Sequence, residues 1–134
     1  MKNYRLVKNE PLYYEFIRQL RNDQRIQNGF IELVNITEKQ QQLYMEKYAD
    51  CFYICVVNET NNPIGYVGVI DKDIRIATHP EHQKQGVASF MIQEIMKIYP
   101  DAQAKVKINN ENSLKLFKKS GFKIKYYILE KEYE

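Results

Sequence analysis

The most informative part of the chain is Asp73-Ile-Arg-Ile-Ala-Thr-His-Pro-Glu-His-Gln-Lys-Gln-Gly86-Val-Ala-Ser-Phe-Met-Ile-Gln-Glu-Ile-Met-Lys-Ile-Tyr99. It predicts a short strand over 74–78, a polar turn, and a mostly apolar helix from about Val87 to Tyr99. The first N–H groups of a helix have no intrahelical partner, and the helix dipole makes that end positive. Gly86 lets the backbone approach a ligand closely, and Ala88 adds little bulk. The turn therefore predicts a main-chain site for an anion such as a pyrophosphate.

Length and composition indicate one folded domain over residues 1–134, because 134 residues with 44% apolar side chains suffice for one hydrophobic core but not two. The net charge of +3 suits a polyanionic small ligand as well as weak nucleic-acid contact. The charge therefore does not distinguish between these two kinds of ligand. The longest apolar runs, such as 51–57, are far below the ~20 residues of a membrane helix. The first residues lack the apolar core of a signal peptide.

The two cysteines, Cys51 and Cys55, are predicted to be free thiols. They lie four positions apart in a strand-like run, so their Cα atoms would be ~13 Å apart, which is beyond disulfide reach. Free thiols fit a reducing compartment, so we expect a cytoplasmic protein without membrane contact.

Periodicity predicts the other elements. Strands are expected at 4–8, 51–58, 63–70, 104–108 and 122–130, and helices after Pro11, from Thr37 to about 49, and over 111–120. Residues 30–35 fit either a loop or a short strand. The segment at 104–108 follows a helix, so it can lie parallel to the strand at 74–78. These elements predict a mixed α/β domain with a twisted, mostly antiparallel sheet, one parallel pair and about four helices.

Two motifs resemble those of the GNAT (Gcn5-related) N-acetyltransferases. Gln83-Lys-Gln-Gly86-Val-Ala88 is similar to that family's acyl-CoA pyrophosphate loop, Gln/Arg-x-x-Gly-x-Gly/Ala. Asn110-Glu-Asn-Ser-Leu-Lys-Leu-Phe117-Lys-Lys-Ser-Gly-Phe122 is similar to its C-terminal motif. Thr78-His-Pro80 precedes the loop, and the resemblance extends from Tyr4 to about Glu130.

The resemblance implies a GNAT-like fold, acetyl-CoA as co-substrate, no metal, and a primary amine as acceptor. The two parallel strands would splay apart to admit the pantetheine arm. A main-chain N–H around Thr78 would face the carbonyl oxygen as it becomes an oxyanion. The residues that the resemblance implies for the cofactor are Ile76, Ala77, Thr78, Gln83, Lys84, Gln85, Gly86, Val87, Ala88, Ser89, Asn110 and Phe117.

Proton transfer is where the sequence departs from the family. The family often has a tyrosine at the position of Phe117, as an acid for the departing thiolate, and phenylalanine has no proton to give. A thiol of pKa near 8.5 leaves tolerably as thiolate, so acid help is dispensable or comes from water, Tyr126 or Tyr127. An alkyl ammonium must lose a proton before it attacks, and Asp73 and Glu32 are candidate bases.

The acceptor is predicted from the segment Leu20-Arg21-Asn22-Asp23 and the polar link that follows it. It is similar both to the subgroup that acetylates nucleotide-linked amino sugars and to the one that acetylates protein N-termini. The chain lacks an acidic run that would recruit a basic protein tail, which favours the amino sugar. Arg21 and Glu32 are the expected acceptor contacts, in a monomer or homodimer. A non-catalytic acyl-CoA-binding regulatory module is the alternative from another class.

Other functions are weaker interpretations of the same residues. A catalytic zinc needs three protein ligands, and His79 and His82 are the only two histidines. A nucleophilic Cys51 or Cys55 would need a histidine base nearby. Most tyrosines fall at helix or strand periodicity, so they indicate packing rather than base stacking. A basic cluster near the C-terminus comprises Lys115, Lys118, Lys119, Lys123 and Lys125. It attracts a CoA phosphate or forms a solvated face more readily than it binds nucleic acid.

Overall fold

The centre of the molecule is an antiparallel sheet in the order β1-β2-β3-β4. The computed structural model describes residues 3–27 and 35–132. The strands are β1 (Tyr4–Lys8), β2 (Phe52–Val57), β3 (Pro63–Ile70) and β4 (Asp73–Thr78). A two-residue turn joins β3 to β4, and both turn residues, Asp71 and Lys72, have positive φ (50° and 67°), as the tight turns of twisted hairpins require.

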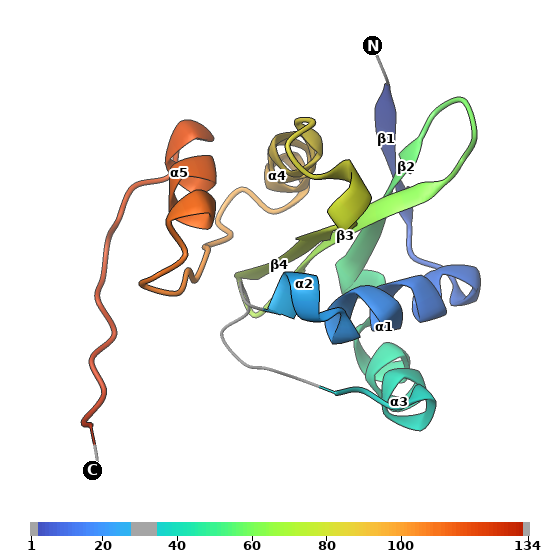
Figure 1. Ribbon diagram of the computed structural model, residues 1–134, viewed down its shortest axis with the longest axis horizontal. Helices are drawn as coiled ribbons and strands as arrows, with labels where there is room; N and C mark the ends of the chain where they lie inside the picture. Colours follow the sequence, from blue (N-terminus) through green and yellow to red (C-terminus); the bar gives the residue numbers. More distant parts are fainter. Residues whose placement is uncertain (1–2, 28–34, 133–134) are drawn as a thin grey trace.

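Helices cover both faces of the sheet (Figure 1). One face carries α1 (Tyr14–Asn22), α2 (Gln24–Gln27) and α3 (Glu38–Tyr48), and the other carries α4 (Val87–Ile98), with α5 (Glu111–Lys119) beyond it. Short 3-10 turns are η1 (Pro11–Tyr13), η2 (Ala49–Cys51) and η3 (Pro80–His82). The described residues thus contain five α-helices rather than about four, because the short α2 follows α1.

The sheet separates two apolar clusters. On the α1–α3 face, Ile17, Met45 and Ile54 are at most 1% exposed. On the α4 face, Met91 and Ile95 are completely buried. Along a pleated strand, successive side chains point to opposite faces, so alternate strand residues belong to alternate clusters. Neighbouring side chains of β4 therefore point to opposite faces of the sheet.

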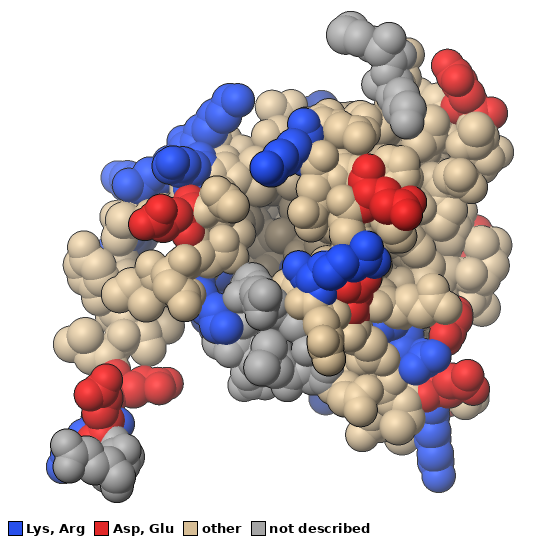
Figure 2. Space-filling model, viewed as in Figure 1, with Lys and Arg blue, Asp and Glu red and all other residues tan. Residues whose placement is uncertain are grey.

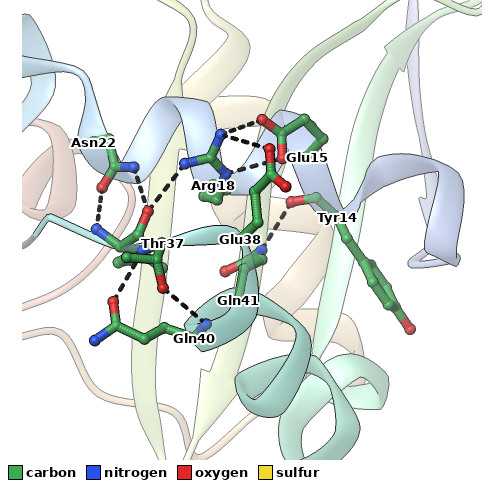
Figure 3. A network of polar contacts seen from close by, with 9 residues as sticks. Tyr14, Glu15, Arg18, Asn22, Thr37, Glu38, Gln40 and Gln41 are labelled. Atoms are coloured by element: carbon green, nitrogen blue, oxygen red, sulfur yellow. Dashed lines mark hydrogen bonds and ion pairs between the residues drawn. The ribbon is translucent and has the colours of Figure 1, made fainter.

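The end of α1 is held against the start of α3 by a polar network (Figure 3). Asn22 donates to the Ile36 carbonyl oxygen (2.8 Å) and accepts from the Ile36 amide (2.7 Å), and Arg18 donates to the same carbonyl (3.0 Å). Thr37 and Gln40 form a capping box at the start of α3, where the sequence predicts that a helix begins. Gln41 completes the network by donating to the Tyr14 carbonyl oxygen (2.8 Å).

Two predicted strands are wrong. Residues 104–108 and 122–130 contain no strand, and the expected parallel pair is reduced to a single bridge between Asp73 and Gln103. Residues 123–132 extend away from the body and are exposed, with Leu129 91% exposed (Figure 1). Both segments alternate as strands do, but a strand needs a hydrogen-bonded neighbour, and neither segment has one in the described structure.

Within residues 3–27 and 35–132, each helix is too short or too polar to cross a bilayer. The ambiguous segment 30–35 lies largely outside the described residues.

Candidate cofactor site

Beyond Ile74, the outer edge of β4 presents backbone amides that have no backbone partner among residues 3–27 and 35–132. The Ile74 amide points outward and donates to the Gln103 carbonyl oxygen (2.9 Å). Amides alternate in direction along a strand, so those of Ile76 and Thr78 point to the same side. The amide between them belongs to Ala77, which is in register with Tyr66 and faces β3. Since β4 is the last strand of the sheet, this edge offers two main-chain donors to a ligand.

Thr78 adds an unsatisfied polar atom at the end of this edge. Its Oγ1 is buried and has no hydrogen-bond partner among the described residues. Buried hydroxyl groups in proteins are nearly always hydrogen-bonded, so an unpaired one indicates a site where a ligand or water binds. The chain then turns at Pro80, where the His79 Nδ1 accepts a hydrogen bond from the Glu81 amide (3.2 Å).

The turn before α4 has the geometry of an anion site. Lys84 (φ 63°) and Gly86 (φ 80°) both adopt the left-handed conformation, and Gly86 is the N-cap residue without a side-chain cap. The first intrahelical bond runs from Phe90 to the Gly86 carbonyl oxygen (3.0 Å). The amides of Val87, Ala88 and Ser89 therefore have no acceptor within the helix.

The space in front of this turn is open. A Cβ built on Gly86 would meet no atom within 4 Å, and residues 83–86 are all exposed. Figure 2 shows a recess at the centre of this face, between the positions that α2, α4 and α5 occupy in Figure 1. Three unpaired helix amides, the positive end of the α4 dipole and the Lys84 charge thus face solvent together, and a pyrophosphate fits such a set.

Two predicted cofactor contacts are Asn110, the N-cap residue of α5, and Phe117 within that helix. Asn110 caps that helix by accepting from the Ser113 amide (3.2 Å), which leaves its side-chain NH₂ group for a ligand. Phe117 is only 6% exposed and packs edge-on against Phe122, with ring centroids 5.1 Å apart. Its ring belongs to the apolar cluster under α4 rather than to the surface.

The candidate acids of the C-terminal segment are distant from the β4 edge. Tyr126 and Tyr127 are 72% and 81% exposed on the segment that extends away from the body (Figure 1). The structure therefore brings neither of them to the amides of Ile76 and Thr78. The positions of Tyr126 and Tyr127 therefore favour the prediction that the thiolate departs without a tyrosine acid.

Of the two candidate bases and the predicted acceptor contact, the structure describes Asp73 and Arg21. Asp73 Oδ2 lies 3.0 Å from Arg75 Nε in an ion pair, and its side chain is 18% exposed. Glu32 lies outside the described residues. Arg21, the predicted acceptor contact, stacks over the Tyr44 ring with 4.4 Å between its Cζ and the ring centroid.

Sequence reasoning missed two residues near Arg21. Arg75 is in register with Gly68, and Gly68 with Phe52, whose ring centroid lies 6.2 Å from that of Tyr44, so Arg75 and Tyr44 lie on the same side of the sheet. Burial raises the pKa of Tyr44, and the guanidinium groups of Arg21 and Arg75 oppose that rise. The period of two along β4 puts Arg75 on one face with Asp73 and could have revealed it.

Neither cysteine is placed for nucleophilic chemistry. Burial raises the pKa of the Cys55 thiol to about 12. Burial also raises the pKa of the Cys51 thiol, and the carboxylates of Asp50 and Asp71 add to that rise. Among residues 3–27 and 35–132, no three His, Cys, Asp or Glu side chains group as metal ligands.

The comparisons identify the family. The model of the acetyltransferase (GNAT) family matches residues 14–122. A search of curated protein sequences found no significant match. A spermidine N-acetyltransferase from Vibrio cholerae, solved with CoA and spermine, superposes with a TM-score of 0.81 at 19% identity, over 97% of this chain and 86% of that one.

Two other solved structures have similar scores. A domain from Methanocaldococcus jannaschii gives a TM-score of 0.80 at 18% identity, over 92% of this chain and 90% of the other. An aminoglycoside N-acetyltransferase in complex with CoA gives 0.73 at 12% identity, over 99% and 96%. At these identities the similar structures show only a shared fold. The family is shown by the family model, which matches residues 14–122 and so covers most of the chain. This chain belongs to the GNAT family of acetyltransferases.

Proposed function

We propose that this protein transfers the acetyl group of acetyl-CoA to the primary amine of a small molecule. The observation that carries the proposal is the pair of outward amides at Ile76 and Thr78, next in the chain to the open turn at Gly86. One CoA molecule uses both groups of donors at once, because its pyrophosphate fits the turn and its pantetheine arm fits the β4 edge. The similar structures support the choice of donor and acceptor, because two of them were solved with CoA and are named for spermidine and aminoglycosides.

Each part of the site has a role in this proposal. The amides of residues 84–89 hold the pyrophosphate, and Lys84 adds a positive charge. The β4 amides align the pantetheine arm, and the side-chain NH₂ of Asn110 reaches it from α5. Gln83 and Gln85 are exposed polar side chains that flank the turn. The lysine side chains that gather over α5 and its C-terminal end in Figure 2 raise the local concentration of the polyanion.

The reaction is a direct displacement. The neutral amine attacks the thioester carbonyl carbon, a C–N bond forms, and the C–S bond breaks to release CoA as a thiolate. The oxyanion of the intermediate accepts from an outward amide of β4, at Ile76 or Thr78, and such a donor is worth roughly 10²–10³ in rate. The incoming ammonium first gives one proton to Asp73 or to water. After the C–N bond forms, the nitrogen loses a second proton, which passes through water to the departing thiolate. Both thiols are held protonated by burial, which supports a route without a covalent enzyme intermediate.

The acceptor we propose is the amine of an amino sugar, such as a nucleotide-linked one. The end of α1 and the start of α3 border a hollow lined by Arg21, Asn35, Ile36, Gln40 and Tyr44. A protein N-terminus would have to enter it as an extended peptide. That hollow holds about 320 Å³, which is the size of a small-molecule site.

Titration with acetyl-CoA, followed by a thiol-release screen over amino sugars and N-terminal peptides, tests the proposal. Micromolar binding with turnover on a small amine is expected. Binding without turnover on any amine would favour the regulatory module. Absence of binding would remove the cofactor assignment.

A further inference from the structure

Two segments of the chain alternate as strands do but have no strand partner in the described structure. They are residues 104–108 and residues 123–130. No backbone amide of either segment donates to a backbone carbonyl among residues 3–27 and 35–132. Backbone amide and carbonyl groups need hydrogen-bond partners, so an extended segment without them is an edge with which another strand can pair.

Residues 104–108 continue the apolar face of the sheet. Ala104 and Val106 pack against the apolar cluster under α4, and Ile108, next on the same side, is fully exposed. The bridge between Asp73 and Gln103 places the start of this segment beside β4. The edge that faces away from β4 therefore has no strand beside it among the described residues, although its side chains are those of a core-facing strand.

The C-terminal arm, residues 123–130, extends away from the body of the molecule (Figure 1). Phe122, just before it, packs against the apolar cluster under α4. Alternate side chains of a strand share one face, so Ile124, Tyr126 and Ile128 would lie on the face of Phe122. They are 50%, 72% and 75% exposed, so an apolar face that continues from the core lies in solvent.

The two segments fit each other in an antiparallel register. Its cross-strand pairs join apolar side chains on the core face and set lysines against apolar side chains on the solvent face. The pairs are Val106 with Ile128, Ile108 with Tyr126, Lys105 with Leu129, and Lys107 with Tyr127. Lysine stems pack on apolar side chains while their ammonium groups stay in water. No lysine of one segment then lies opposite a lysine of the other, which would be unfavourable.

The area of such a contact is that of a stable interface. One buried tyrosine accounts for roughly 150–250 Å², so an arm with Tyr126 and its apolar neighbours covers roughly 400 Å². Two arms and the two surfaces that receive them then bury about 1,600 Å², the standard size of a stable protein–protein interface. An exchange of two arms is therefore large enough to hold two copies together.

We propose that two copies of this chain exchange their C-terminal arms, each arm pairing as an antiparallel strand with residues 104–108 of the other copy. One molecule presents both the arm and the segment that matches it, and neither has a strand partner in the described structure. Because the arm is directed away from the body, a second copy can pair both segments while the arm keeps its direction (Figure 1). Each copy gives one arm and receives one, so a two-fold axis closes the assembly. This proposal is independent of acetyl transfer.

The mass of the full chain in solution is the first test. Sedimentation velocity across a micromolar concentration series should give a dimer. Proline removes one backbone donor, and successive amides of a strand point to opposite sides, so either Tyr127→Pro or Ile128→Pro removes a bond to the other copy. That variant should raise the dissociation constant at least about 10-fold. Glu132→Pro, which lies beyond the arm, is the matched control and should leave the dissociation constant unchanged.

Three results of this experiment would contradict the proposal. A monomer throughout the series would overturn the exchange. Assemblies that keep growing with concentration would overturn its closure by a two-fold axis. A dimer that neither proline variant weakens would show that the arm does not form the interface.

Disulfide cross-linking identifies the chain with which each arm pairs. Cys51, a partly exposed free thiol, is first replaced by serine. Lys107→Cys is then placed in one chain and Tyr127→Cys in another, and the two proteins are mixed under a mild oxidant. A disulfide between the chains is expected, because residues directly opposite in paired strands have Cβ atoms ~4.5–5.5 Å apart. Lys105→Cys with Lys125→Cys, which is four positions out of register, is the control and should give none.

A single chain that carries both Lys107→Cys and Tyr127→Cys distinguishes exchange from folding back. Exchange predicts a covalent dimer. A disulfide within one chain, formed equally well at high dilution, would show that the arm pairs with its own residues 104–108 and would overturn the proposal.

Discussion

The Ile74 amide donates to the Gln103 carbonyl oxygen at 2.9 Å, and it marks the point at which β4 stops pairing on its outer side. Beyond it, every second amide of the strand points outward and has no backbone partner in the described part of the chain. Inward amides hold the sheet together, while we propose that the outward ones bind the cofactor. Adjacent residues of one strand therefore have separable roles.

Proline substitution separates these roles. Ile76→Pro removes an outward amide, and an edge strand tolerates a missing outward N–H. We expect a folded protein with kcat reduced roughly 10²–10³-fold, measured by thiol release. Ala77→Pro is the matched control: it removes a bond to β3 and should lower the thermal midpoint sharply. Full activity in Ile76→Pro would show that this amide has no catalytic role.

Gly86→Glu should abolish CoA binding, because it places a carboxylate where the pyrophosphate is expected. Gly86→Ala is the control: its Cβ meets no atom within 4 Å, so its cost is the left-handed φ of 80°, about 1–2 kcal/mol of stability. Calorimetric titration with CoA measures both variants. Micromolar affinity in a folded Gly86→Glu protein would remove the turn from the cofactor site.

Asp73→Asn tests the candidate base. If the carboxylate accepts the ammonium proton, the amide should lower kcat mainly at low pH, where solvent accepts the proton poorly. The pH–rate profile of kcat measures this. An unchanged profile would leave Asp73 with only its ion pair to Arg75.

Cys55 gives stability a dependence on alkaline pH. Burial raises its pKa to about 12 in the folded state, from 9.0, so above pH 9 the unfolded chain loses this proton first. The unfolded state then binds fewer protons, and the thiol's contribution to stability falls by about 1.4 kcal/mol per pH unit between these values. Urea unfolding from pH 8 to 10.5 measures it. Cys55→Ala should show a shallower decline, and equal slopes would contradict the assignment.

Much of the fold follows from the sequence because the signals are local. The capping box at Thr37, the αL glycine before α4 and the apolar period of β2 and β3 each depend on neighbouring residues. The strands at 104–108 and 122–130 are different, because a ladder needs a partner that alternation alone does not provide. Arg75 lies close enough to lower the pKa of Tyr44 only because of the sheet register and the docking of α3, so this relationship depends on the tertiary structure.

The geometry of the candidate cofactor turn could be predicted from the sequence for the same reason, whereas its binding of CoA stays a prediction. Its turn is contiguous in sequence, and backbone geometry rather than distant side chains creates its donors. The acceptor side that we propose joins α1 and α3, so Arg21 alone could be picked out from the sequence. The sequence also predicts Phe117 as a cofactor contact, which stays a prediction, and the structure places its ring within the apolar cluster.

The exposed C-terminal segment has a consequence for handling the protein in solution. Tyr126, Tyr127, Ile128 and Leu129 form an apolar β-prone stretch that is 72–91% exposed. Such a stretch is a template for aggregation, and charged residues on either side suppress it. Lys123 and Lys125 precede it, and Glu130, Lys131 and Glu132 follow it. Neutralising these flanking charges should lower the concentration at which the protein precipitates, long before it changes the fold.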